Sequence, residues 1–211
     1  MKLLLTSSGI TNKSIEKAFS ELVEKPFSKL YLTFIPTAAN VEKGDKSWLV
    51  EDMYNFKKLG FSAFDVIDIS AVSRSIWLPS FEKADILVFG GGNVYHLLKW
   101  IKKSGLENLL PELLKTKVYV GISAGSMVTA KNISLSSSGI LYYEQTGNFK
   151  NVDGLGFVDF EIRPHLNSKG FPKVRLDYLQ KLARKTSNSF YAIDDGTAIK
   201  VVDSRISLIS E

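Results

Sequence analysis

The sequence contains no cysteine and only two histidines, His96 and His165. The absence of thiols excludes disulfide bonds, zinc–thiolate sites, iron–sulfur clusters and a cysteine nucleophile. With so few imidazoles, a histidine-rich metal site is not expected either. Any reaction that needs an imidazole base must use one of these two residues. We therefore expect a protein that works without a metal ion or another cofactor.

Long apolar runs and long basic runs are also missing. No segment approaches the roughly 18 apolar residues of a membrane-spanning helix. The apolar stretch Leu3–Leu5 is shorter than a signal-peptide core of about 7–15 residues, so a cytoplasmic protein is expected. The net charge of +5 is dispersed along the chain, which does not favour a nucleic-acid or membrane partner.

The composition fits an ordinary globular protein of 211 residues. Hydrophobic residues make up 45% of the chain, and thirteen Phe, eight Tyr and three Trp provide bulky side chains for a core. No repeat or linker-like segment interrupts residues 1–211, so we expect a single domain. The sequence leaves open whether the protein is a monomer or a homodimer.

Short apolar segments alternate with amphipathic helices over the first 130 residues. This order predicts a parallel sheet with helices on both faces. The predicted helices are Thr11–Glu24, Ser47–Leu59, Val94–Lys103, Glu107–Leu114 and a short one over Ser126–Lys131. The predicted strands are Lys2–Thr6, Lys29–Ile35, Ser62–Ile69, Asp85–Phe89 and Val118–Val120.

The carboxy-terminal part has mostly strand patterns and one convincing helix, Lys173–Lys185. It predicts that some antiparallel strands continue the parallel core. The Ser-rich segment Ser134–Gly139 is expected to be a mobile loop. The predicted strands here are Ile140–Glu144, Phe157–Ile162, Ser189–Ile193, Ala198–Val202 and Arg205–Ile209.

The strongest local motif is Gly121-Ile122-Ser123-Ala124-Gly125. It has the pattern G-x-S-x-G between a predicted strand and a predicted helix, which places a serine on a tight strand-to-helix turn. The glycines allow a strained backbone there, and free N–H groups at the start of the helix can stabilise an anion. The motif predicts that Ser123 is a nucleophile rather than part of a structural turn.

The three glycines Gly90–Gly92 also follow a predicted buried strand and precede a helix. One interpretation is a phosphate-binding turn, but neither G-x-G-x-x-G nor G-x-x-x-x-G-K-[ST] is present. The other is an oxyanion hole, because an acyl-transfer serine needs a second N–H donor from a neighbouring loop. The presence of Ser123 favours the oxyanion hole over a nucleotide-binding protein.

A serine nucleophile needs a base and a carboxylate that orients it. His165 lies just past the end of a predicted strand, whereas His96 lies within a helix and is the weaker candidate. The residue types alone do not choose among the acids, although two of them end a predicted strand at a turn. The candidates are Glu144, Asp153, Asp159, Glu161, Asp194 and Asp195.

Taken together, these segments resemble peptidase family S51, which includes aspartyl dipeptidase and cyanophycinase. The resemblance covers almost the whole chain and implies a three-layer α/β/α sandwich with a mostly parallel sheet. Such a fold is like that of class I glutamine amidotransferase domains, with serine in place of cysteine. The matching stretches, in family order, are Phe34–Ala38, Gly90–Asn93, Gly121–Ser126, Pro164–His165 and Asp194–Ala198.

The resemblance also implies residue roles for a serine peptidase. Ser123 would attack the peptide carbonyl, and His165 would transfer its proton to the leaving amine. Asp195 stands where the family commonly carries Glu. It would be the third member of a Ser-His-acid catalytic triad, with Asp194 as the alternative. The backbone N–H groups of Gly92 and Ala124 would form the oxyanion hole.

The family resemblance further suggests the substrate, a short peptide with an amino-terminal aspartate (Asp-X). An acidic side chain is best recognised by a guanidinium, so Arg163 and Arg175 are the expected specificity residues. Gly91 and Asn93 are expected to contact the substrate as well. Two alternatives are kept: cleavage of an aspartate-rich polymer, as in cyanophycinase, and a binding or regulatory module without hydrolysis.

Overall fold

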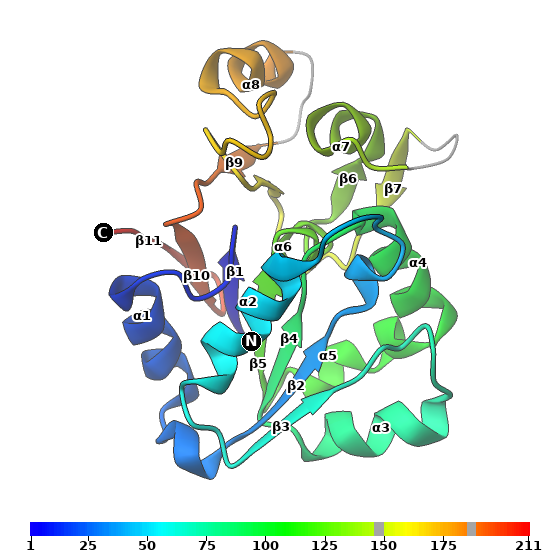
Figure 1. Cartoon of the computed structure of the whole chain (residues 1–211), viewed down its shortest axis with the longest axis vertical. Helices are drawn as coiled ribbons and strands as arrows, with labels where there is room; N and C mark the ends of the chain where they lie inside the picture. Colours follow the sequence, from blue (N-terminus) through cyan, green and yellow to red (C-terminus); the bar gives the residue numbers. More distant parts are fainter. Residues whose placement is uncertain (146–149, 185–188) are drawn as a thin grey trace.

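The computed structural model describes residues 1–145, 150–184 and 189–211, and a seven-stranded sheet forms its centre. Five strands are parallel, and two antiparallel strands extend one edge (Figure 1). The parallel carboxyl ends therefore meet on one side of the sheet, where α/β proteins usually bind ligands. In spatial order the strands are β11 (Arg205–Ile209), β10 (Ala198–Val202), β1 (Lys2–Thr6), β5 (Val118–Ile122), β4 (Ile86–Phe89), β2 (Tyr31–Ile35) and β3 (Ala63–Val66).

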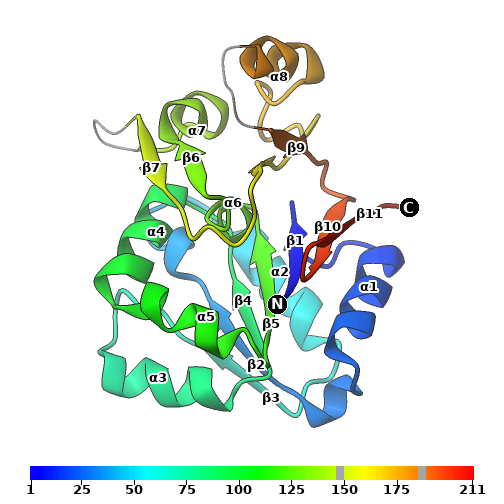
Figure 2. The same ribbon diagram turned by 180° about the vertical axis from the view of Figure 1, so that it is seen from behind.

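Helices cover both faces of this sheet, and the two views in Figures 1 and 2 show one layer each. The helices α1 (Lys13–Val23) and α2 (Ser47–Lys57) pack on one face. The other face carries α3 (Arg74–Lys83), α4 (Val94–Lys103) and α5 (Leu110–Leu113). The predicted three-layer α/β/α fold is confirmed.

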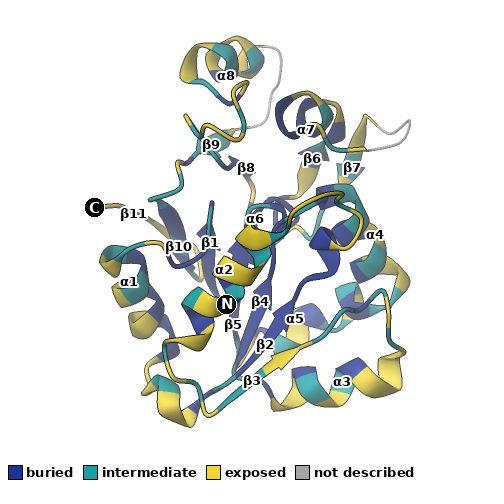
Figure 3. Ribbon diagram, viewed as in Figure 1, coloured by how far each residue is buried: buried dark blue, intermediate teal, exposed yellow. Residues whose placement is uncertain are grey.

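Side-chain alternation along the strands explains the two layers. In β1, Leu4 belongs to the apolar cluster under α1 and α2, whereas Leu3 and Leu5 belong to the cluster on the opposite face. All three leucines are fully buried, and the central strands are buried throughout (Figure 3). Both faces of the central strands therefore contribute to the core, as expected for a parallel sheet between two helical layers.

Smaller elements lie beyond the carboxyl ends of the sheet strands (Figure 1). The short helix α6 (Ala124–Met127) directly follows β5. A parallel pair, β8 (Glu161–Arg163) with β9 (Phe190–Ala192), forms a separate two-stranded sheet. The remaining elements are β6 (Asn132–Ser134), α7 (Leu135–Tyr142), β7 (Asn151–Asp153), α8 (Leu176–Ala183) and the 3-10 helices η1 (Phe27–Lys29), η2 (Thr37–Ala39) and η3 (Leu106–Asn108).

The prediction was wrong between residues 134 and 144. The expected loop Ser134–Gly139 and the expected strand Ile140–Glu144 are largely one helix, α7. Ser138 is completely buried and its hydroxyl donates to the carbonyl of Ser134, while Leu141 packs into the core. Tertiary packing therefore overrides the low helix propensity of the serines.

Other predicted elements differ in extent. Phe157–Ile162 was predicted as a strand, but β8 contains only Glu161–Arg163. The predicted helix Lys173–Lys185 corresponds to α8, and its last residue lies outside the described residues. Within the described ranges, no helix combines the length and apolar character needed to cross a membrane.

Candidate active site

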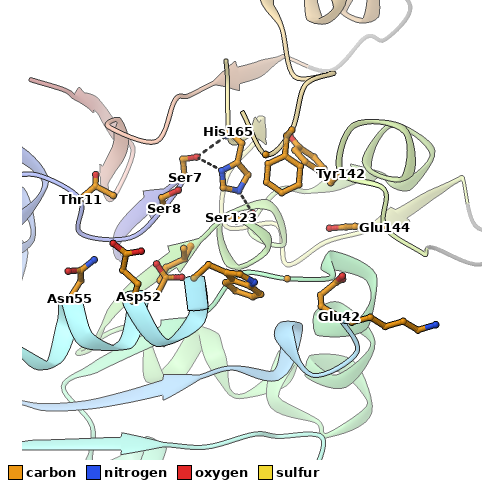
Figure 4. Close-up of a pocket in the computed structure, with 18 residues that line it drawn as sticks. Ser7, Ser8, Thr11, Glu42, Asp52, Asn55, Ser123, Tyr142, Glu144 and His165 are labelled. Carbon is orange, nitrogen blue, oxygen red and sulfur yellow. Dashed lines mark hydrogen bonds between the residues drawn. The ribbon is translucent and has the colours of Figure 1, made fainter. Parts of the chain in front are cut away.

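A cavity of about 510 Å³ opens at the carboxyl ends of the parallel strands. Ser123 follows β5, Gly91 and Gly92 follow β4, and Ser7 and Ser8 follow β1, and all five line this cavity. Figure 4 shows Ser123 and His165 together in the pocket. The fold thus brings the glycine loop and the G-x-S-x-G motif to one place, as parallel strand ends should.

Ser123 occupies a strained turn between β5 and α6. Its backbone has φ 47° and ψ −106°, which is unusual for a residue with a side chain. The turn is fixed at its base because the N–H of Ser123 and the hydroxyl of Ser126 both donate to the carbonyl of Thr6. A Cβ at Gly125 would overlap the carbonyl of Phe89, so only glycine fits there. These constraints hold the Ser123 hydroxyl in the pocket.

The glycine loop presents backbone N–H groups beside Ser123. Gly92 has φ 123°, and a Cβ there would overlap the backbone of Ala38. Among the described residues, no acceptor takes the N–H of Gly92 or that of Ala124. Two N–H groups on adjacent loops are what an oxyanion hole requires. Gly91 also faces the cavity, since a Cβ there would lie 3.5 Å from Cβ of Ser123.

His165 links Ser123 to Asp195 through hydrogen bonds. Its Nε2 lies 3.0 Å from Oγ of Ser123, and its Nδ1 lies 2.7 Å from Oδ1 of Asp195. The parallel pairing of β8 with β9 explains this meeting, because His165 and Asp195 follow the two strands by two and three residues. The structure therefore brings together the three residues to which the family resemblance assigned the roles of nucleophile, base and acid.

Two serines after β1 complete this arrangement, and the sequence did not single them out. Ser7 accepts the N–H of His165 at 2.8 Å and donates to Oδ1 of Asp195 at 2.6 Å. Ser8 donates to the same oxygen at 2.8 Å. The available signal was the position of two hydroxyl residues directly after the first strand.

The environment of His165 fixes its ring and keeps its partner ionised. Phe171 stacks on the imidazole with ring centroids 4.6 Å apart, and Tyr142 approaches it edge-on. Burial raises the pKa of the Asp195 carboxyl, but hydrogen bonds from His165, Ser7 and Ser8 outweigh this effect. The pKa of Asp195 consequently lies well below its usual range, so this carboxylate is charged at any physiological pH.

Arg163 and Arg175, the expected specificity residues, lie outside the cavity lining. Arg163 is almost fully buried and pairs with the carboxylate of Glu161 at 2.6 Å. The guanidinium of Arg175 donates to the carbonyls of Ser168, Phe171 and Val174, which stabilises the loop before α8. Their surroundings give both arginines structural contacts and no exposure to the pocket.

Asn93 and His96 are also occupied elsewhere. The Asn93 side chain caps α4 by accepting the N–H of His96 at 2.9 Å, and it does not line the cavity. His96 lies on α4 next to Trp100, away from Ser123. Asp194 accepts from Gly196 and Thr197 and so shapes the turn that carries Asp195. Among the other candidate acids, only Glu144 lines the cavity; Asp153, Asp159 and Glu161 do not.

Carboxylates dominate the charged lining of the cavity. Glu42, Glu51, Asp52 and Glu144 all contribute, whereas Lys43 is the single lysine or arginine among the described lining residues. Burial raises the pKa of Glu144 to about 8, although the N–H of Val94 partly offsets this. Within the described chain, no three His, Asp or Glu residues are grouped to hold a metal ion.

Asp52, on α2, is the second carboxyl of the lining whose pKa is raised. Burial raises its pKa to about 7, and the neighbouring Glu51 acts in the same direction. Its side chain makes no hydrogen bond or ion pair to another described residue. The ionised form is thus destabilised by desolvation with no partner in the chain to compensate.

The raised pKa of Asp52 predicts how stability changes with pH. Between about pH 4 and pH 7 the unfolded chain releases the proton while the folded chain retains it, so the free energy of unfolding falls as pH rises. We expect Asp52→Asn to abolish this decline and to stabilise the protein by up to about 4 kcal/mol above pH 8. Urea unfolding at pH 5 and pH 8 measures this pH dependence, with Glu82→Gln, an exposed carboxylate on α3 outside the cavity lining, as the control. An equal pH dependence in wild type and Asp52→Asn would contradict the prediction.

Comparison with known proteins places these features in context. The chain matches the model of peptidase family S51 over residues 3–209. An uncharacterized peptidase of Listeria monocytogenes is 31% identical over 212 residues, which covers 97% of this chain and 98% of the relative. Peptidase E of a Nostoc species is 28% identical and covers 99% of this chain and 86% of its own length.

Solved structures show the same similarity. A crystal structure of a Listeria monocytogenes protein described as a candidate Peptidase E superimposes with a TM-score of 0.81 at 28% identity. That match covers 100% of this chain and 98% of the other. A peptidase from an acI-B1 Actinobacterium has a TM-score of 0.74 at 19% identity, covers 100% and 87%, and supports the fold alone.

Proposed function

This chain belongs to peptidase family S51 and is a serine peptidase, and from this premise we propose that it hydrolyses short peptides with Ser123, His165 and Asp195 as its catalytic triad. The observation that supports the proposal most is the continuous hydrogen-bond chain, 3.0 Å from Oγ to Nε2 and 2.7 Å from Nδ1 to Oδ1. These lengths are those expected of a nucleophile, its base and the group that orients the base.

The proposed reaction proceeds in two acyl-transfer steps. Oγ of Ser123 attacks the peptide carbonyl, and its proton passes to Nε2 of His165. The N–H groups of Gly92 and Ala124 stabilise the resulting oxyanion. His165 then gives the proton to the leaving amine, and an acyl-enzyme remains. Water, deprotonated by the same imidazole, hydrolyses the acyl-enzyme and releases the amino-terminal product.

Asp195 has an electrostatic role in this proposal. Its carboxylate accepts the Nδ1–H of His165, which leaves the Nε2 lone pair directed at Ser123. The low pKa of Asp195 keeps it ionised, so it stabilises the imidazolium that forms during attack. The hydroxyls of Ser7 and Ser8 hold the carboxylate in place.

The substrate class we propose is short peptides cleaved after their first residue, with an amino-terminal aspartate as the specific candidate. Relatives named Peptidase E support this choice. The cation available to such a side chain is Lys43, which lines the cavity and is exposed. In this proposal Lys43 takes the role that the sequence had suggested for Arg163 and Arg175.

A dipeptide panel tests the substrate. We expect Asp-Leu to be cleaved faster than Glu-Leu, Asn-Leu and Ala-Leu, and N-blocked Asp-Leu to be a poor substrate. Lys43→Gln should raise KM for Asp-Leu by about two- to fivefold, because exposed charge pairs contribute little. Lys57→Gln, an exposed lysine outside the lining, is the control. Equal rates for Asp-Leu and Ala-Leu would reject the aspartate preference but would not contradict the proposed catalytic triad.

Labelling with a fluorophosphonate tests the chemistry separately from the substrate. A reactive Ser123 forms a covalent adduct that mass spectrometry assigns to that residue. A folded protein that neither reacts nor cleaves any peptide would instead be a binding module on the peptidase fold.

A further inference from the structure

Asp52 presents an unpartnered carboxylate to the same cavity as Ser123. Its side chain is only 9% exposed, and it forms no hydrogen bond or ion pair with another described residue. In Figure 4 it extends from α2 towards the space beside Ser8, Thr11 and Asn55. Buried carboxylates are normally paired or hydrogen-bonded, so a missing partner in the free protein points to a ligand.

The position of Asp52 is close to the reacting serine. A Cβ built on Gly9 would lie 3.3 Å from Oδ1 of Asp52 and 3.4 Å from Cδ1 of Ile122. The same point thus touches both the carboxylate and the residue directly before Ser123. Asp52, Ile122 and Ser123 thus all border one cavity, which a bound peptide would occupy.

The hydroxyls next to Asp52 have also used their protons. Ser8 donates to Oδ1 of Asp195, and Thr11 donates to the backbone carbonyl of Asp195, each at 2.8 Å. Both residues line the cavity, and only their acceptor lone pairs are left for a ligand. Asp52, Ser8 and Thr11 thus form a set of acceptors that suits a group with several N–H donors.

From these contacts we propose that Asp52 binds the free α-ammonium group of the peptide substrate and so makes the enzyme an amino-terminal exopeptidase. The inference rests on the proposed peptidase function and specifies how that site selects its substrate. In a short peptide cleaved after its first residue, the ammonium nitrogen and the carbonyl carbon that Ser123 attacks are bonded to the same Cα. An –NH3⁺ group has three donors, which match the Asp52 carboxylate and the two hydroxyls.

Glu144 is the other enclosed carboxyl of the cavity, and its contacts fit this role less well. One of its oxygens accepts the N–H of Val94 at 3.2 Å, at the start of α4. The other has no surface open to a ligand. Glu42 and Glu51 also line the cavity, but their side chains are more exposed than that of Asp52. Asp52 is thus the carboxylate that is both unpartnered and open to the pocket.

Kinetics with matched peptides test the proposal. Asp52→Asn keeps the side-chain shape and should raise KM about 10- to 100-fold for peptides with a free amino terminus, as expected for loss of a charged hydrogen bond. For the N-acetylated forms of the same peptides, Asp52→Asn should raise KM by less than about threefold. Hydrolysis of p-nitrophenyl acetate, a neutral ester, should be unchanged and shows that Ser123 and His165 still work. Lys57→Gln, which removes an exposed charge on the same helix outside the cavity lining, is the control.

Binding measurements separate this inference from the proposed chemistry. Calorimetry with the Ser123→Ala protein, which needs no turnover, should show tighter binding of Ala-Leu than of N-acetyl-Ala-Leu. Adding Asp52→Asn to Ser123→Ala should weaken binding of Ala-Leu about 10- to 100-fold. The affinity for the acetylated peptide should stay the same. Equal affinity for the two peptides, or an Asp52→Asn effect of the same size on both, would overturn the role of Asp52. If the wild type does not hydrolyse p-nitrophenyl acetate, that result would instead overturn the peptidase mechanism.

Discussion

Ser123→Ala is expected to lower kcat/KM for dipeptides by about 10⁴-fold or more, since removal of a serine nucleophile disables the whole triad. The change removes Oγ, the atom 3.0 Å from Nε2 of His165, and leaves the cavity otherwise intact. Initial rates at substrate concentrations below KM give kcat/KM directly. Residual hydrolysis would come from substrate binding and the oxyanion hole alone.

The controls for Ser123→Ala separate chemistry from folding. The variant should unfold cooperatively with a midpoint close to that of the wild type, because the turn is held by backbone contacts and by Ser126. Fluorophosphonate labelling should be lost in Ser123→Ala and retained in Ser136→Ala, whose hydroxyl lies on an exposed position of α7. Dipeptide hydrolysis at a wild-type rate by Ser123→Ala would remove the serine from the mechanism.

Local pattern was sufficient for much of the fold. The strands Lys2–Thr6, Ala198–Val202 and Arg205–Ile209 and the helix Val94–Lys103 begin and end where the sequence predicts. Each combines a clear hydrophobic period with an end that is marked by a turn or a charge. By contrast, α3 contains Pro79 and has only a weak hydrophobic periodicity, and the sequence analysis did not predict it. Its helical state depends on Trp77 and Phe81, which are buried against the sheet.

The candidate site divides in the same way. Ser123 follows β5 of the main sheet, whereas His165 and Asp195 follow the paired strands β8 and β9 of a separate sheet. Their selection came from the motifs and the family resemblance. The only local signal for Ser7 and Ser8 is their position directly after the first strand, and Asp52 has none, although Ser7 and Asp52 are buried in the fold. The roles of the two serines follow from contacts across more than a hundred residues of chain, as in the hydrogen bonds of Ser7 and Ser8 to Asp195. Arg163 shows the converse, because a charge next to His165 in the sequence points into a buried ion pair.

Asp195→Asn is expected to lower kcat for the best dipeptide by about 10³- to 10⁴-fold while preserving the fold. The carboxylate accepts the Nδ1–H of His165 at 2.7 Å and two serine hydroxyls at the same oxygen. An amide can place its NH₂ group towards Nδ1, which favours the tautomer with its proton on Nε2. That tautomer cannot accept the proton of Ser123. KM should change little, because Asp195 does not line the cavity.

The neighbouring acid provides the matched control. Asp194→Asn alters a carboxylate that contacts Gly196 and Thr197 and makes no contact with His165, so activity should fall by less than about tenfold. The pH dependence adds a second criterion. Because the pKa of Asp195 is well below its usual range, its ionisation cannot produce a limb of the wild-type profile near neutrality. Asp195→Asn should therefore lose activity at every pH between 6 and 9. Larger losses in Asp194→Asn than in Asp195→Asn would exchange the roles of the two acids and would show that the hydrogen bond to Nδ1 is not the one that orients the base.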